Sequence, residues 1–182
     1  YIIMKVILLI IILILIYIFI NEIWLKETPD KNFNNRNLDD DGYIVFNNIK
    51  NEKTILKYLP DNYVFLNYKY TIKGCSLSTF HRDVTSSRYI FKTNYPVYTY
   101  IVYNNNKGPL LSVCPGSHKT VPYLSSRPKT IIGNNNNTSV LFNCDLVHAG
   151  AINDLGNTRY AEQFKIAHVK DLDKLKHLDK KN

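Results

Sequence analysis

The sequence lacks several of the signatures that identify common protein classes. It contains three cysteines in 182 residues, Cys75, Cys114 and Cys144, and no two of them form a C-x-x-C pair. This pattern gives no indication of a disulfide framework. No glycine-rich loop, no D-F-G tripeptide and no internal repeat is present. The length fits one ordinary domain with an additional segment attached.

Positive charge is not concentrated in one patch, although the formal net charge is +8. Such a charge could indicate nucleic acid or an anionic membrane surface. Because the basic residues are scattered outside the tail at 165–182, we expect no nucleic-acid partner. In that tail Leu172, Leu175 and Leu178 recur at a helical step with charges between them. Residues 170–182 are therefore predicted to be a basic C-terminal helix or tail, either solvated or in contact with anionic lipid.

A long apolar run occurs at the N-terminal end alone. Residues 6–20 are all apolar or aromatic, and with the residues before Lys5 they approach the roughly 20 that cross about 30 Å of hydrocarbon. No small residue suited to signal-peptide cleavage follows the run, and Trp24 suits the membrane interface. We predict a transmembrane signal anchor at residues 1–24, a membrane partner and a single-pass membrane location. The excess of basic residues after the run favours a cytosolic domain and leaves the side open.

The rest of the chain reads as a linker followed by a β-rich domain. Residues 25–41 are polar and are predicted to be a linker into a domain over residues 42–169. Residues 50–59 are predicted to form a helix that Pro60 closes. The predicted strands are 42–47, 63–72, 97–103, 110–114, 139–144 and 159–167. Many short strands at this spacing predict an antiparallel barrel or sandwich.

Two unrelated chemistries use the tripeptide His81-Arg82-Asp83. A kinase catalytic loop needs a magnesium-binding Asn five residues after the Asp, and Arg88 stands there instead. On a strand, side chains two apart point to the same face, so His81 and Asp83 can grip one metal ion while Arg82 points away. A third ligand must then come from elsewhere in the fold. The candidates are the remaining histidines, His118, His148, His168 and His177.

Arg159, which follows His148 in the sequence, is suited to bind a co-substrate. His148 lies in a strand-like run over residues 141–152, and Arg159 follows it by eleven residues across a turn. Two histidines and one carboxylate form a facial triad that leaves positions open on ferrous iron. An antiparallel return would bring Arg159 alongside the metal strand, where its guanidinium could hold a carboxylate bidentately. The alternative for Arg159 is a surface ion pair.

Three further segments carry a family resemblance. Residues 108–119 contain the run P-G-S-H-K, residues 146–159 read L-V-H-A-G-A-I-N-D-L-G-N-T-R with Asn153 inside, and residues 41–46 read D-G-Y-I-V-F. Together with the H-x-D pair, these segments resemble the iron(II)/2-oxoglutarate oxygenase superfamily and, within it, the phytanoyl-CoA dioxygenase family. The similarity runs from about residue 38 to residue 168 in the family's order.

The resemblance implies a mainly β fold, a double-stranded β-helix of the jelly-roll or cupin type with minor flanking helices. It implies catalytic iron(II) ligands at His81, Asp83 and His148, and 2-oxoglutarate bound by Arg159. In this family 2-oxoglutarate is decarboxylated as dioxygen is split, and a hydroxyl group is transferred to an unactivated carbon. Ascorbate is to be considered as an accessory reductant.

We therefore expect a membrane-anchored dioxygenase that hydroxylates a small-molecule or lipid-like substrate. One alternative is a prolyl or lysyl protein hydroxylase. Another is a catalytically inactive β-helix that acts as a binding module on a membrane.

Other polar residues near the predicted site have less specific signals. Thr79 shares a strand face with the predicted ligands, and Tyr100 lies in a predicted core strand. Either could hydrogen-bond the co-substrate, with core packing as the alternative. His118 is expected to support the turn of P-G-S-H-K rather than to bind metal. Cys144, on the predicted strand of His148, is expected to be a buried structural thiol.

Overall fold

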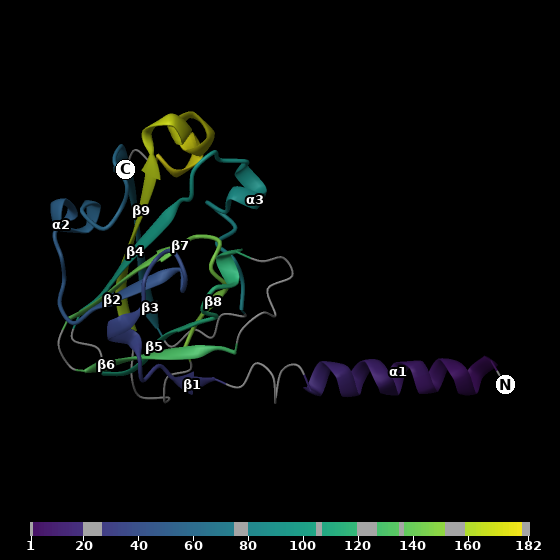
Figure 1. The fold of residues 1–182 in the computed structure, drawn as a ribbon. Helices are drawn as coiled ribbons and strands as arrows, with labels where there is room; N and C mark the ends of the chain where they lie inside the picture. Colours follow the sequence, from purple (N-terminus) through teal and green to yellow (C-terminus); the bar gives the residue numbers. More distant parts are fainter. Residues whose placement is uncertain are drawn as a thin grey trace.

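Two β-sheets form the body of the protein in a computed structural model, which describes residues 2–19, 27–74, 80–104, 107–119, 127–134, 137–151 and 159–179 (Figure 1). The four-stranded sheet has the order β1 (Thr28–Pro29), β6 (Lys129–Asn134), β5 (Lys107–Val113), β8 (His148–Gly150). The five-stranded sheet has the order β2 (Tyr43–Phe46), β7 (Thr138–Asn143), β4 (Tyr98–Tyr103), β9 (Arg159–His168), β3 (Tyr63–Gly74). All pairings are antiparallel except that of β1 with β6.

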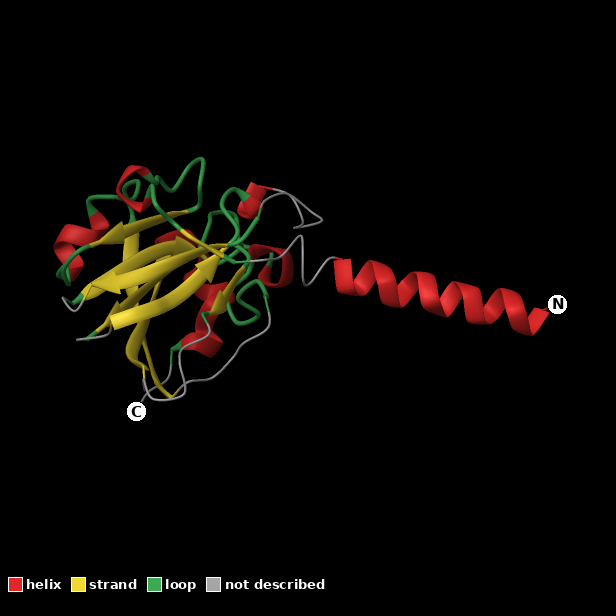
Figure 2. Cartoon of the chain, turned by 90° about the horizontal axis from the view of Figure 1, so that it is seen from below, coloured by secondary structure: helices red, strands yellow, loops and turns green. Residues whose placement is uncertain are grey.

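The predicted mainly β fold is confirmed, and the two sheets with few helices are compatible with a jelly-roll sandwich (Figure 2). Each predicted strand corresponds to an observed strand with shifted ends. Strands β1 and β6 were not predicted, and β8 was predicted only as part of one run with β7 over residues 141–152. β1 spans two residues and β8 three, which is too short for a hydrophobic period to be recognised.

Strand β4 lies in the middle of the five-stranded sheet and is buried on both faces. Because successive side chains of a strand alternate, Ile101 and Tyr103 enter the core between the sheets. The intervening residues enter a second core, on the outer face, to which helix α2 (Glu52–Leu56) contributes. They are Tyr98, Tyr100 and Val102. Odd-numbered residues of β4 therefore face the interior of the sandwich.

Short helices flank the sheets. The helix predicted over residues 50–59 is reduced to α2, whose N-cap Asn51 accepts a hydrogen bond from the amide of Thr54. Such a cap satisfies one of the amides that a helix start leaves unpaired. Helix α3 (Arg88–Phe91) has no counterpart in the sequence prediction and begins after the N-cap Ser87.

The C-terminal segment packs against the body. It forms a 3₁₀ helix, η4 (Val169–Leu178), in the region where a basic helix or tail was predicted. Leu175 and Leu178 are buried in a small core with Ala167 of β9, whereas Leu172 is 37% exposed. Two of the three leucines thus anchor the helix, which is not simply solvated.

The predicted membrane-spanning helix is not found. Helix α1 (Ile2–Ile18) has 17 residues, about 26 Å of rise against about 30 Å of hydrocarbon. Among the described residues no helix is long and apolar enough to cross a membrane. The prediction of a single-pass membrane location is therefore wrong.

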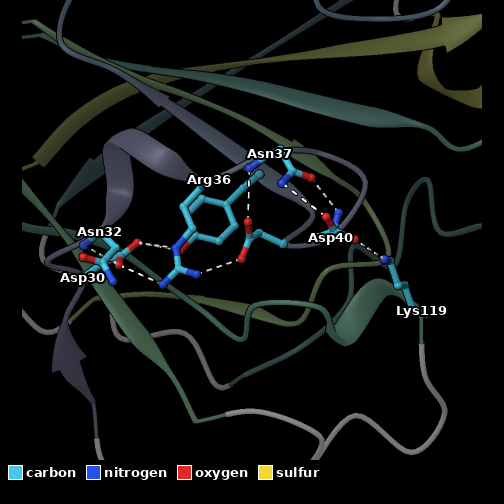
Figure 3. A network of polar contacts seen from close by, with 8 residues as sticks. Asp30, Asn32, Arg36, Asn37, Asp40 and Lys119 are labelled. Carbon is cyan, nitrogen blue, oxygen red and sulfur yellow. Dashed lines mark hydrogen bonds and ion pairs between the residues drawn. The ribbon is translucent and has the colours of Figure 1, made fainter.

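Residues 27–41, most of the predicted linker, contact the sheets and the turn that follows β5. β1 extends the four-stranded sheet. Beyond it Arg36 pairs with Asp30 at 3.0 Å, and Asp40 pairs with Lys119 at 3.0 Å (Figure 3). Lys119 belongs to the P-G-S-H-K segment, whose Gly116 amide also donates to the carbonyl of Asp41, the first residue of the D-G-Y-I-V-F segment, at 2.9 Å.

Candidate metal centre

His81 and His148 are held together by their backbones. The amide of each donates to the carbonyl of the other at 2.9 Å, in an isolated antiparallel bridge. Their ring centroids lie 4.6 Å apart. His148 opens β8 and is buried, while His81 is half-buried. The structure thus brings together two of the three predicted ligands.

The protonation state of His148 suits a metal ligand. Burial and the neighbouring His81 lower the pKa of His148 to about 4, so its ring is neutral at physiological pH. Its Nδ1 lies 2.9 Å from the carbonyl oxygen of Leu146. Because a carbonyl can only accept, Nδ1 carries the proton and Nε2 keeps a free lone pair. Metal-binding histidines commonly use the other ring nitrogen in this way.

The carboxylate of Asp83 is occupied by protein donors. One oxygen accepts from the amide of Thr85 at 3.2 Å and from its hydroxyl at 2.7 Å. The other forms an ion pair with Lys165. Within the described ranges, no three His, Cys, Asp or Glu side chains form a group that could hold a metal ion. The donor set fits ferrous iron in its chemistry, and in this structure the Asp83 carboxylate contacts Lys165 and Thr85.

Lys165 is fully buried between strands. Its ammonium lies 2.8 Å from the hydroxyl of Thr99 and 3.8 Å from the sulfur of Cys144, in addition to its pair with Asp83. Burial alone would raise the pKa of Asp83, but the charge and hydrogen bond of Lys165 hold that pKa below its ordinary value.

The ammonium of Lys165 is itself kept charged. Burial lowers the pKa of Lys165, while the charge and hydrogen bond of Asp83 raise it, and the net direction is upward. Burial also raises the pKa of Cys144 to about 11, so that thiol is protonated at neutral pH. Asp83 is therefore the negative charge that balances Lys165.

Sequence reasoning missed Lys165, although a signal was present. Residues 159–167 were predicted to be a strand, and alternation puts Lys165 on the same face as Arg159. In the structure Arg159, Ala161 and Gln163 all line the interior cavity, whereas Tyr160 is exposed. The same alternation carries Lys165 into the interior.

A cavity of about 340 Å³ lies between the two sheets and contains both histidine rings in its wall. The remaining lining residues come from both sheets. They are Tyr70, Ile72, Ile101, Tyr103, Leu111, Phe142, Gly150, Arg159, Ala161 and Gln163. Imidazole and guanidinium groups thus reach one cavity.

Arg159 is 4% exposed, which excludes the surface ion pair considered as its alternative role. Its Nη1 donates to the carbonyl of Leu110, which fixes the guanidinium in the cavity wall. The sequence predicted that the strands of Arg159 and His148 lie side by side. In the structure these two strands are not paired. β8 belongs to the four-stranded sheet and β9 to the five-stranded sheet. The two residues meet the cavity from opposite sheets.

The structure places Tyr100 away from the cavity. Its hydroxyl accepts from the amide of Lys50 at 2.8 Å and donates to the carbonyl of Lys50 at 3.0 Å, on the outer face of the sheet. The strand was predicted correctly, but the predicted strand did not specify which face is inward. Tyr103 of the same strand lines the cavity instead. Thr79, the other predicted co-substrate contact, and Asn153 lie outside the described residues.

His118 contacts the segment before β2. Its Nε2 lies 3.1 Å from the carbonyl of Asp39, and a side chain at Gly42, where φ is +86°, would meet its ring at 2.6 Å. Arg82 points away from the cavity, as predicted, and donates to the carbonyls of Asp145 and Ser117, each at 2.8 Å.

Cys144 is a buried free thiol, as expected. It lies in the turn between β7 and β8, however, and not on one continuous strand with His148. The predicted run over residues 141–152 is two strands that belong to different sheets. The turn moves the chain from the five-stranded sheet to the four-stranded sheet.

No protein-family model and no curated relative matches the chain, so the resemblance to the phytanoyl-CoA dioxygenase family is not confirmed. Solved structures do match. The non-haem α-ketoglutarate-dependent carbocyclase SnoK from nogalamycin biosynthesis superposes with a TM-score of 0.53 at 12% identity, covering 75% of this chain and 83% of SnoK. HygX from Streptomyces hygroscopicus, with nickel and 2-oxoglutarate bound, superposes with a TM-score of 0.50 at 13% identity, covering 72% and 84%.

The match to another structure, EvdMO1, spans 30% of that longer chain. At these identities the likeness concerns the fold. The chain shares its fold with a 2-oxoglutarate-dependent carbocyclase and with a protein that binds nickel and 2-oxoglutarate.

Proposed function

We propose that the protein is a non-haem iron(II), 2-oxoglutarate-dependent oxygenase that hydroxylates a small molecule. The observation that carries the proposal is the meeting of His81, His148 and Arg159 in the wall of one interior cavity. SnoK, whose fold is similar, is described as α-ketoglutarate-dependent, and HygX as binding nickel and 2-oxoglutarate. Nickel is a common replacement for iron at imidazole and carboxylate ligands.

His81 and His148 would hold the iron, and the carboxylate of Asp83 would complete a facial set after leaving Lys165. When bound, the metal supplies the activation of dioxygen and the oxidative decarboxylation of 2-oxoglutarate. The guanidinium of Arg159 would hold the far carboxylate of 2-oxoglutarate from the opposite sheet. Its fixed position in the cavity wall would orient the co-substrate toward the histidines.

Tyr103 would support Arg159 in that task. Burial raises the pKa of Tyr103, against the opposing effect of Arg159, so the phenol is protonated at neutral pH. A protonated phenol in the cavity wall can donate a hydrogen bond to a carboxylate. This role replaces the one that the sequence suggested for Tyr100.

The cavity volume favours a small substrate. About 340 Å³ lies at the lower end of the range of small-molecule sites, roughly 300–1,000 Å³, and 2-oxoglutarate would take part of it. Apolar side chains, including Ile101, Leu111 and Phe142, supply much of the wall, which suits an unactivated carbon. We retain the phytanoyl-CoA dioxygenase-like family as the finer proposal, on the sequence motifs. A prolyl or lysyl protein hydroxylase is the less supported enzymatic alternative.

A second candidate function is a catalytically inactive binding module. The observation that favours it is the ion pair of Asp83 with Lys165, which neutralises the carboxylate without a metal.

The test supplies the full chain with iron(II), 2-oxoglutarate and dioxygen and measures succinate. We expect succinate above a protein-free control, and we expect its loss in His148→Ala. The exposed His177, which stacks on Phe91, provides a matched control, since His177→Ala should retain turnover. A folded wild-type protein that releases no succinate and binds no metal would support the binding module instead.

A further inference from the structure

We infer that Lys165 is a built-in competitor of the metal: its ammonium takes the place of a metal ion at the Asp83 carboxylate and thereby sets the affinity of the site for divalent cations. This inference rests on the proposed function, because it concerns the same site. It assigns to Lys165 a role that neither the sequence motifs nor the fold indicates.

The ion pair of Lys165 with Asp83 is buried. Lys165 is fully buried, and Asp83 is 7% exposed. The ammonium reaches the same carboxylate that would complete the ligand set of His81 and His148. One carboxylate oxygen is taken by Lys165 and the other by the backbone and side chain of Thr85. A metal therefore gains Asp83 by displacing one of these donors.

The charges of this pair are balanced. Among the described residues, the one ion pair of Lys165 is that with Asp83, so the two charges balance each other. A divalent ion beside them would leave an uncompensated ammonium in an interior where charges interact strongly. Metal binding to the wild-type protein is therefore weakened both by competition for Asp83 and by repulsion from Lys165.

Lys165 also has a second partner. Its ammonium lies 2.8 Å from the hydroxyl of Thr99, which is paired with it across β4 and β9. After Asp83 turns to a metal, Thr99 can still accept from the ammonium. The ammonium therefore keeps one hydrogen-bond acceptor after the exchange.

A merely structural role for Lys165 makes a different prediction. If the ammonium served only to neutralise a buried aspartate during folding, its removal would destabilise the protein without changing metal affinity. If it competes with the metal, its removal tightens metal binding, and the metal restores the stability that was lost, because a ligand that binds the folded state stabilises it.

The test compares full-length wild type with Lys165→Met, which keeps the length of the side chain without its charge, and with Lys165→Gln, which keeps a hydrogen-bond donor. Mn(II) affinity is measured from the electron paramagnetic resonance signal of the free ion, and the melting temperature is measured in EDTA and in Mn(II). We expect both variants to bind Mn(II) about tenfold more tightly or better. We also expect them to melt lower than wild type in EDTA and to regain stability in Mn(II).

Lys69→Met is the matched control, because it removes one lysine from an exposed ion pair with Glu162 on the neighbouring strand. It should leave Mn(II) affinity unchanged. Folded Lys165 variants whose Mn(II) affinity equals or falls below that of wild type would overturn the inference and leave the proposed function standing. If neither wild type nor variants bind Mn(II), the inference and the proposed function both fail.

A measurement on the wild type does not depend on the folding of the variants. In protein labelled with ¹⁵N-lysine, a diamagnetic ion, Zn(II), should shift the Lys165 ammonium resonance as Asp83 is withdrawn from it. An Lys165 resonance that stays unchanged at saturating Zn(II) would overturn the inference.

Discussion

The ammonium of Lys165 and the carboxylate of Asp83, 82 residues apart in the sequence, form a buried ion pair. One partner belongs to the H-x-D motif, and the other lies on the strand that begins with Arg159. The pair therefore links the predicted metal ligands to the strand that carries the predicted co-substrate residue.

Arg159→Ala should weaken 2-oxoglutarate binding by about tenfold or more while sparing the metal, because a charge-assisted bidentate contact contributes roughly 1.5–3 kcal/mol. Calorimetric titration of 2-oxoglutarate into the Mn(II)-loaded protein measures the effect. Arg159→Lys should recover part of the affinity. Equal losses of metal and 2-oxoglutarate binding in Arg159→Ala would mean that the residue is structural.

Two tyrosines of β4 allow a paired test of the inward face. Tyr103→Phe should weaken 2-oxoglutarate binding several-fold, since it removes one hydrogen bond of about 1 kcal/mol. Tyr100→Phe should leave that binding unchanged and lower the free energy of unfolding by about 1 kcal/mol, because the hydroxyl bonds the backbone of Lys50. The opposite assignment of the two effects would contradict the observed face of β4.

The C-terminal helix should depend on its buried leucines. Leu175→Ala should lower the free energy of unfolding by about 2–4 kcal/mol, because Leu175 is 2% exposed in the core that it shares with Ala167. Leu172→Ala, on the exposed side of the same helix, should cost less than about 0.5 kcal/mol. Chemical denaturation of the two variants measures the difference, and equal small effects would show that η4 is not docked.

The Asp30 network should stabilise the protein in a pH-dependent way. Burial would raise the pKa of Asp30, but Arg36 and the hydroxyl of Tyr43, at 2.6 Å, hold it below its ordinary value. A lowered folded-state pKa means that the contribution is complete above the unfolded value of 3.8 and is lost as the pH falls through the folded value. Asp30→Asn should therefore cost about 1–3 kcal/mol at pH 7 and less at pH 3. Denaturation curves at both pH values measure this, and a cost that does not change with pH would contradict it.

Strands could be predicted from the sequence where the pattern of β-branched and aromatic residues was long enough to be recognised. The strands around Tyr63, Tyr98 and Arg159 have β-branched and aromatic residues over six residues or more, and each was predicted. Strand β8 was predicted only as part of one longer run with β7, because three residues carry no period of their own.

The alternation of side chains along a strand limited what could be predicted about the site. The alternation of a strand assigns its residues to two faces, but it does not say which face is inward, and Tyr100 was therefore chosen in place of Tyr103. For β9, Arg159 was predicted to face the site. Lys165 lies six residues further along the same strand, so the same alternation places it on the same face. The ion pair of Asp83 with Lys165 joins residues that lie 82 positions apart in the sequence, which no local pattern contains.

The most direct test of the central claim is an anaerobic titration of the full chain with iron(II) and then 2-oxoglutarate, followed by visible absorption. Chelation of the ion by a 2-oxo acid in the cavity should produce a charge-transfer band in the wild type and in Tyr100→Phe, and none in His148→Ala. Absence of that band in a folded, iron-saturated wild-type protein would contradict the account.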